Sequence, residues 1–184
     1  QKLRQRALIG DDVGLGKTIE AGLILKELAA RNRADRVLFV VPAHLQKKWI
    51  RDMDRFFDVD LTVADRAWVE GERRRLGEEA NIWNQDQQQL VTSMAFLRQD
   101  EFQPALRDAF WDVVVVDEAH KAAKRGESPS KTANMVDTVT GKSDSLLLLS
   151  ATPHDGKGEA FRSLVEYIDP FLVAENRELS QETV

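Results

Sequence analysis

The 184-residue sequence contains no cysteine and no long uninterrupted run of apolar residues. Without cysteine, disulfides and thiolate zinc sites are excluded, and a reducing, cytoplasmic setting is the expected one. The longest apolar runs, such as Val113–Val116 and Leu146–Leu149, are far too short to cross a bilayer, so we expect no membrane partner. Only three scattered histidines are present, which argues against a transition-metal site.

A strong charge of either sign is also missing. The sequence has 26 Lys and Arg residues and 31 Asp and Glu residues, which gives a net charge of −5. This balance argues against wholesale electrostatic capture of nucleic acid, but it leaves room for a local basic stripe. The length and the 42% of hydrophobic residues suit one domain over residues 1–184. The chain opens on Gln1 and on polar and basic residues, so we expect a piece of a longer protein without a signal peptide.

Short β-rich runs alternate with helical patterns along the chain. The runs that predict strands are Ala7–Ile9, Val37–Val41, Leu61–Val63, Leu90–Ser93, Val113–Val116 and Leu146–Leu149. Apolar residues at helical spacing follow within 18–30, 45–56 and 160–168. Residues 66–89 are expected to form a surface helix plus a loop, and 119–142 to include a mobile loop. Strands alternating with helices predict an α/β fold with a mostly parallel sheet flanked by helices on both faces.

The same spacing predicts which face of the first two helices is buried. In the first helix the predicted buried stripe consists of Ile19, Leu23, Ile24 and Leu28. In the second helix it consists of Leu45, Trp49, Met53 and Phe56. Trp49 is therefore expected to be a core residue.

A glycine-rich loop follows the first predicted strand. Asp11–Thr18 is DDVGLGKT, which matches the phosphate-binding pattern G-x-x-x-x-G-K-[ST] except for an aspartate at the first glycine. Gly14 and Gly16 allow backbone N–H groups to approach phosphate oxygens, and the next helix adds the positive end of its dipole. Lys17 is expected to reach the β- and γ-phosphates, and Thr18 to place its hydroxyl on Mg²⁺. The alternative is a glycine-rich turn with an exposed lysine.

Two adjacent carboxylate residues, Asp117 and Glu118, follow directly after the predicted strand Val113–Val116. Charged side chains are rarely buried without a partner, and Mg²⁺ binds through one or two carboxylates while it keeps several waters. We therefore expect Asp117 to be a Mg²⁺ ligand, and Glu118 to orient and deprotonate the attacking water. The alternative is a strand that ends in polar residues at the surface.

Small hydroxylated residues follow the predicted strand Leu146–Leu149 in the same way. Ser150 and Thr152 are placed to hydrogen-bond the acidic cluster or His120. The alternative is a strand followed by a turn, with Pro153 after it.

In order and spacing, these motifs resemble those of the superfamily 2 helicase-like ATPases, most closely the Swi/Snf-type group. The stretches that carry the resemblance are 11–22 (DDVGLGKTIEAG), 37–49 (VLFVVPAHLQKKW), 91–97 (VTSMAFL), 117–120 (DEAH) and 150–153 (SATP). The usual loop in that superfamily is A-x-x-G-x-G-K-T, so the missing first glycine is not required. The nucleotide contacts that the resemblance implies are Asp12, Val13, Gly14, Leu15, Gly16, Lys17, Thr18 and Ile19.

The resemblance implies that ATP and Mg²⁺ bind between two RecA-like lobes, of which this chain is similar to the first. The second lobe, with its arginine finger, would belong to the same parent chain. The implied reaction is hydrolysis of ATP to ADP and phosphate, with Glu118, Lys17 and Asp117 as the catalytic residues. The isolated chain is then expected to be inactive or very weak. His120 is implied to couple the ATP site to Ser150 and Thr152.

The resemblance also implies contact with a nucleic-acid backbone, and double-stranded DNA is the expected partner. The residues concerned are Pro42, His44, Lys47, Lys48, Thr92 and Ser93. A helix after Pro42 offers free N–H groups for a phosphate. Alternatively, the two lysines are a solvated face. Two other functions remain open: a stand-alone ATP-binding switch without turnover, and a lobe of a DEAH-type RNA helicase.

Overall fold

The computed structural model describes residues 5–10, 16–123, 129–151 and 158–169. Within these residues the chain forms a six-stranded sheet of order β1-β6-β5-β2-β4-β3, and every neighbouring pair of strands is parallel. The strands are β1 (Gln5–Ile9), β2 (Val37–Val41), β3 (Thr62–Val63), β4 (Gln89–Ser93), β5 (Trp111–Val116) and β6 (Ser143–Leu149). Each of them overlaps a run that predicts a strand.

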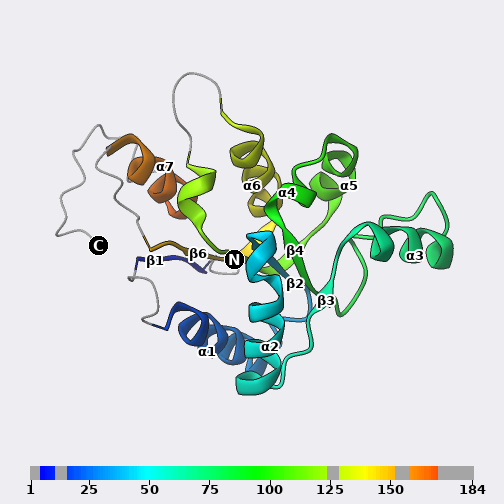
Figure 1. Cartoon of the computed structure of the whole chain (residues 1–184), viewed down its shortest axis with the longest axis horizontal. Coiled ribbons are helices and arrows are strands. Elements are labelled where there is room, and N and C mark those ends of the chain that lie inside the picture. The colour runs from blue at the N-terminus through cyan, green and yellow to red at the C-terminus, as the bar shows by residue number, and fades with distance from the viewer. Residues whose placement is uncertain (1–4, 11–15, 124–128, 152–157, 170–184) are drawn as a thin grey trace.

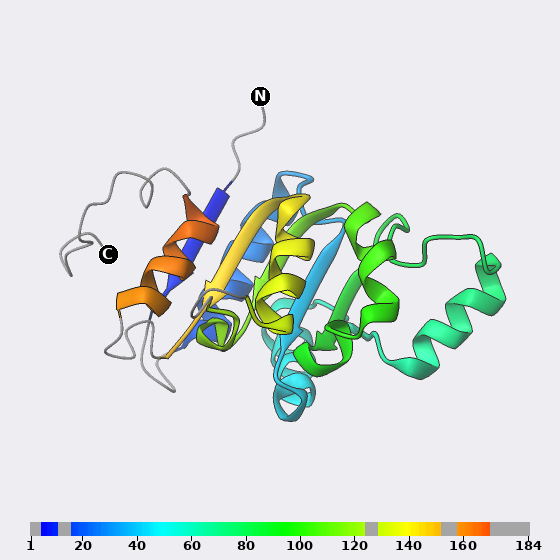
Figure 2. The same cartoon turned by 90° about the horizontal axis from the view of Figure 1, so that it is seen from above.

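Helices cover both faces of this sheet (Figure 1). One face carries α1 (Lys17–Ala30) and α2 (Gln46–Phe57). The other carries α4 (Met94–Leu97), α5 (Gln103–Asp108), α6 (Lys131–Gly141) and α7 (Gly158–Ile168). Helix α3 (Arg66–Leu76) projects beyond the β3 end of the sheet (Figures 1 and 2). The predicted α/β fold, with a parallel sheet between two helical layers, is confirmed.

The described residues also contain three short 3₁₀ helices: η1 (Ala43–Leu45), η2 (Asp100–Phe102) and η3 (Ala119–Ala122). None of the described helices is both long enough and apolar enough to span a membrane.

The central strands are apolar at consecutive positions because helices bury both of their faces. All five residues of β2 are fully buried, and the register places Phe39 between Val91 of β4 and Val115 of β5. Side chains alternate between the two faces of a strand, so β2 contributes to two separate hydrophobic clusters. Phe39 packs against Trp49 of α2, with ring centroids 5.1 Å apart, which ties α2 to the sheet.

The predicted buried faces of α1 and α2 are wrong in part. Ile19 is 38% exposed, Leu23 60% and Phe56 53%, whereas Ala21 and Phe57 are buried. The reason is close packing of the two helices: α1 places Gly22 against the ring of Phe57 at the end of α2. This approach rotates the larger apolar side chains of α1 toward solvent.

Residues 119–142 contain a helix that the sequence analysis did not predict. Much of the region is helix α6, which begins at a Ser130 cap whose hydroxyl accepts a hydrogen bond from the Ala133 N–H. Its buried face is built from Ala133, Met135, Val136, Val139 and Thr140. Small and β-branched residues give only a weak helical periodicity of apolar positions, and for this reason the helix was not predicted from the sequence. The predicted mobile loop falls partly on 124–128, which lie outside the described residues.

The contact between α1 and α2 leads to a stability prediction. A methyl group added at Gly22 would overlap the ring of Phe57, whereas one added at Gly71 in α3 meets nothing within 4 Å. We expect Gly22→Ala to lower the free energy of unfolding by about 1–3 kcal/mol. The control Gly71→Ala should raise it by about 0.5–1 kcal/mol, because alanine is the better helix former. Urea denaturation measures both, and equal effects would contradict the close packing.

Candidate functional site

The strand register brings the carboxyl ends of four strands to one edge of the sheet. Beyond β5, the Asp117 N–H donates to the Val40 carbonyl at 2.9 Å, and beyond β6, the Ser150 N–H donates to the Ile9 carbonyl at 3.0 Å. The carboxyl ends of β1, β6, β5 and β2 therefore lie side by side. Ligands of open parallel sheets bind at this edge.

A cavity of about 590 Å³ opens at this edge. Its volume is in the range of small-molecule sites. The residues that line it come from the start of α1, from η1 and α2, and from the loops after β5 and β6: Gly16, Lys17, Thr18, Ile19, His44, Leu45, Lys48, Trp49, Asp52, Phe56, Asp117, Glu118 and Ala151. Residues far apart in the sequence thus share one pocket.

The glycine-loop side of the pocket is the N-terminus of α1. Gly16 has a left-handed backbone conformation, with φ 103°, which residues other than glycine rarely adopt. Among the described residues no side chain caps the start of α1, and its first turn lines the pocket with the positive end of the helix dipole. Of the predicted nucleotide contacts, the structure brings Gly16, Lys17, Thr18 and Ile19 together in the pocket. The other four, at positions 12–15, lie outside the described residues.

The Asp117 carboxylate is 8% exposed and is held at both oxygens. The Trp49 indole N–H donates to Oδ2 at 2.8 Å, and the Glu118 backbone N–H donates to Oδ1 at 2.8 Å. Trp49 is buried, as predicted for a core residue, but its link to Asp117 was missed. The link could have been anticipated, because a tryptophan predicted to be buried usually needs a hydrogen-bond acceptor for its indole N–H.

Glu118 has a left-handed backbone, with φ 52° and ψ 44°, a conformation that costs a non-glycine residue roughly 1–2 kcal/mol. Its Oε2 lies 3.3 Å from His120 Nδ1, and the same nitrogen lies 3.2 Å from Ser150 Oγ. A chain of contacts therefore joins Glu118, His120 and Ser150. Thr152 lies outside the described residues.

Lys48 is one of the residues that line the pocket, and its side chain is 48% exposed. Its Nζ donates to Thr18 Oγ1 at 3.0 Å and lies 3.0 Å from Asp52 Oδ2. Burial alone would raise the pKa of Asp52, but Lys48 and Arg51 outweigh it and lower that pKa. Asp52 is therefore ionised at neutral pH, and its charge helps to hold the Lys48 ammonium. Asp52 is a pocket residue that the sequence patterns did not single out.

The remaining residues predicted to touch a nucleic acid fall into two groups. Pro42 is buried and directly precedes η1, whereas His44 is exposed at the pocket and Lys47 is exposed on α2. Thr92 is fully buried and its hydroxyl donates to the Ala64 carbonyl at 2.8 Å. Ser93 is 8% exposed and caps α4 by accepting from the Phe96 N–H. Packing thus buries Thr92 and Ser93 and engages their hydroxyls, whereas His44 and Lys47 are exposed.

A magnesium ion fits the donor set of this pocket. Thr18 supplies a hydroxyl and Asp117 a carboxylate to the lining of the same pocket, and Mg²⁺ usually takes one or two carboxylates together with phosphates and waters. Among the described residues no cluster of three or more His, Asp or Glu side chains forms a complete metal cage.

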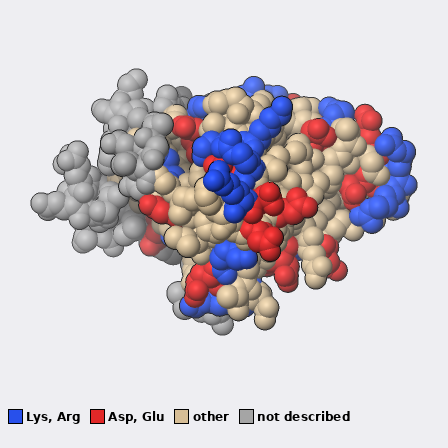
Figure 3. Space-filling view, turned by 60° about the horizontal axis from the view of Figure 1, so that its bottom comes forward, with Lys and Arg blue, Asp and Glu red and all other residues tan. Residues whose placement is uncertain are grey.

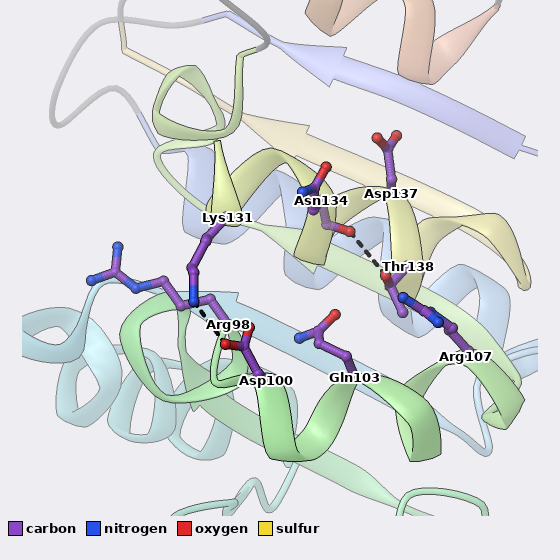
Figure 4. Close-up of a pocket in the computed structure, with 8 residues that line it drawn as sticks. All are labelled: Arg98, Asp100, Gln103, Arg107, Lys131, Asn134, Asp137 and Thr138. Atoms are coloured by element: carbon purple, nitrogen blue, oxygen red, sulfur yellow. Dashed lines mark hydrogen bonds and ion pairs between the residues drawn. The ribbon is translucent and has the colours of Figure 1, made fainter. Parts of the chain in front are cut away.

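A second cavity, of about 420 Å³, lies between α5 and α6 (Figure 4). The residues that line it are all polar or charged, and Lys131 crosses to Asp100 at 2.8 Å. It has no apolar wall and no glycine at a helix start, so it is a poorer candidate for a nucleotide site than the first cavity.

The indole bond to Asp117 can be tested against another buried tryptophan. Trp49→Phe removes a hydrogen bond to a charged group, and Trp111→Phe removes an indole N–H that has no partner within the described residues. Both side chains are at most 2% exposed, so the loss of apolar area is similar. We expect Trp49→Phe to cost about 2 kcal/mol more in unfolding free energy by urea titration. Equal losses would show that the bond contributes nothing to stability.

Comparisons with known proteins agree with these observations. The SNF2-related domain family matches residues 2–183. The RNA polymerase-associated protein RapA of Yersinia pestis (strain Pestoides F) is 34% identical over 171 residues, as is RapA of Yersinia pseudotuberculosis (serotype O:1b). These matches cover 92% of this chain, and the chain spans only 17% of the length of these relatives.

Two solved structures from Sulfolobus solfataricus share the fold. The SWI2/SNF2 ATPase core in complex with dsDNA aligns with a TM-score of 0.71 and 21% identity, over 90% of this chain and 31% of that one. The SWI2/SNF2 ATPase core domain aligns with a TM-score of 0.66 and 22% identity, over 93% and 32%. The chain belongs to the SNF2-related domain family, and it is a helicase-like ATPase lobe of the Swi/Snf type.

Proposed function

We propose that this lobe binds ATP with Mg²⁺ and hydrolyses it to ADP and phosphate once a second RecA-like lobe completes the site. The observation that carries the proposal is the single pocket in which Gly16–Thr18 faces Asp117 and Glu118. Phosphoryl transfer uses a helix that begins at a glycine and carries a lysine and a hydroxyl for the phosphates and Mg²⁺. It also uses a carboxylate pair for the ion and the base.

Each side chain has a definite task in this proposal. Lys17 contacts the β- and γ-phosphates, and Thr18 and Asp117 hold Mg²⁺, which neutralises charge on the phosphate oxygens when it is bound. Glu118 accepts the proton of the attacking water at its carboxylate, and its strained backbone fixes where that carboxylate lies. His120, between Glu118 and Ser150, couples the base to the loop after β6.

The rim of the pocket supports a second lobe as its cover. Ile19 is 38% exposed and Phe56 is 53% exposed, and both line the cavity. Leu23, one helical turn after Ile19, is 60% exposed. Apolar side chains grouped at a site mark surfaces that another protein segment covers. A cationic group from that segment is worth about 10³–10⁵ in rate in related phosphoryl transfers.

Double-stranded DNA is the proposed nucleic-acid partner. One of the Sulfolobus structures that share the fold is a complex with dsDNA. On the face shown in Figure 3, a compact group of Lys and Arg side chains lies beside Asp and Glu side chains. With a net charge of −5, binding must depend on such local groups and not on the overall charge. Lys47, exposed on α2, belongs to this proposed contact.

The base assignment predicts a separation of binding from turnover. Glu118→Gln, in the protein that carries both lobes, should bind ATP normally and hydrolyse it about 10²–10⁴-fold more slowly, because the amide cannot accept the proton. Single-turnover hydrolysis and binding of a fluorescent ATP analogue measure the two quantities.

Two variants control this experiment. Lys17→Ala should abolish nucleotide binding, and Glu79→Gln, at an exposed position away from the pocket, should leave binding and turnover unchanged. Hydrolysis by Glu118→Gln at the normal rate would disprove the base assignment. Robust hydrolysis by this chain alone would show that a second lobe is not needed.

The nucleic-acid assignment predicts an effect of Lys47→Gln on duplex DNA. The variant should bind every sequence more weakly, and the slope of log affinity against log salt should fall by about one, because one phosphate contact is lost. Lys26→Gln, an exposed lysine on α1, is the charge-matched control. Fluorescence anisotropy at fixed salt compares duplex DNA with duplex RNA, and tighter binding of RNA would overturn the choice of DNA.

A further inference from the structure

We infer that Lys48 is a nucleotide-site residue that competes with the divalent cation for Thr18, and so weakens the coupling between Mg²⁺ and ATP. This rests on the proposed function, because it assumes that Thr18 holds the ion. Nothing in the glycine loop or the carboxylate pair assigns a role to a side chain of α2.

The geometry places the Lys48 ammonium at the expected metal ligand. Nζ donates to Thr18 Oγ1 at 3.0 Å, across the gap between α2 and α1. The same nitrogen lies 3.0 Å from Asp52 Oδ2, one turn further along α2. Its neighbour Trp49 holds Asp117 at 2.8 Å, so two consecutive residues of one helix contact both predicted magnesium ligands.

The two contacts of α2 differ in how easily they can be broken. Trp49 is 2% exposed and fixed in the core, and its neutral N–H supports the carboxylate charge. The Lys48 side chain is 48% exposed, and its flexible stem allows the ammonium to move. The Trp49 hydrogen bond to Asp117 is therefore fixed by core packing, whereas the Lys48 hydrogen bond to Thr18 can exchange with solvent or with a bound ligand.

A cation on Thr18 must displace or repel this ammonium. The Lys48 N–H group uses a lone pair of the Thr18 hydroxyl oxygen, which is the atom that would bind the metal. A divalent ion on Oγ1 would also lie within a few ångströms of a positive charge, and at that separation repulsion is substantial even near a protein surface. Asp52 is shared with Arg51 at 2.9 Å, so only part of its negative charge offsets Lys48.

Lys48 is also suited to act before the metal arrives. Beside the first turn of α1, its charge favours a free polyphosphate, which lacks the neutralising ion. Lys48 and Mg²⁺ therefore perform overlapping tasks at the same hydroxyl. Each one reduces the benefit that the other brings to nucleotide binding, and this mutual effect is a measurable coupling.

The test measures how much Mg²⁺ improves ATP binding in the absence of nucleic acid. A fluorescent ATP analogue is titrated by anisotropy into the chain with EDTA, and again with saturating MgCl₂. We expect the improvement to be about threefold larger in Lys48→Gln than in the wild-type chain, because the competing charge is gone. Lys48→Arg, which keeps the charge, should stay close to wild type.

The variant is expected to fold, since Asp52 keeps its pairing with Arg51, and circular dichroism verifies this. Lys26→Gln makes the same charge change on exposed α1 and should leave the improvement at its wild-type value. An improvement in Lys48→Gln that equals or falls below wild type would overturn the inference and make Lys48 a plain phosphate ligand or a surface residue. If the wild-type chain itself bound no nucleotide, the proposed function would fail first.

Discussion

The parallel register of β1, β6, β5 and β2 is the constraint on which the rest of the structure depends. It aligns the carboxyl ends of these strands, so the residues that follow each of them meet at one edge. Because β6 lies between β1 and β5, Ser150 is placed beside His120 and beside Ile9 at the end of β1. Burial of the strands on both faces requires two helical layers, and this edge is where the loops between strands and helices gather.

Helix α2 is the second element on which the site depends. It packs on the sheet through Phe39 and Trp49, and from that anchored position it reaches Asp117 and Thr18. The strained backbone of Glu118 is held by its hydrogen bond to Asp117, which in turn is held by Trp49. Stability of the core and geometry of the proposed catalytic base are therefore linked through one indole group.

Much of the fold could be predicted because apolar runs and turn residues are local signals. All six strands overlap runs seen in the sequence, and α1, α2 and α7 follow from apolar spacing. Helix α6 was missed because its buried face uses Ala, Val and Thr. The buried sides of α1 and α2 were assigned incorrectly in part, because Gly22 against Phe57 sets the rotation of these helices, and that contact joins residues far apart in the chain.

The sequence by itself determined the parallel α/β fold, the family and the two motifs that face each other in the pocket, because these depend on local patterns and on the order of strands. Only the tertiary structure decided that Trp49 holds Asp117, that Lys48 contacts Thr18 and that Thr92 is buried against Ala64. The physical reason is that a polar side chain takes its role from the partner that packing brings to it. A motif fixes the spacing of residues along the chain, but it does not fix which groups meet across two elements.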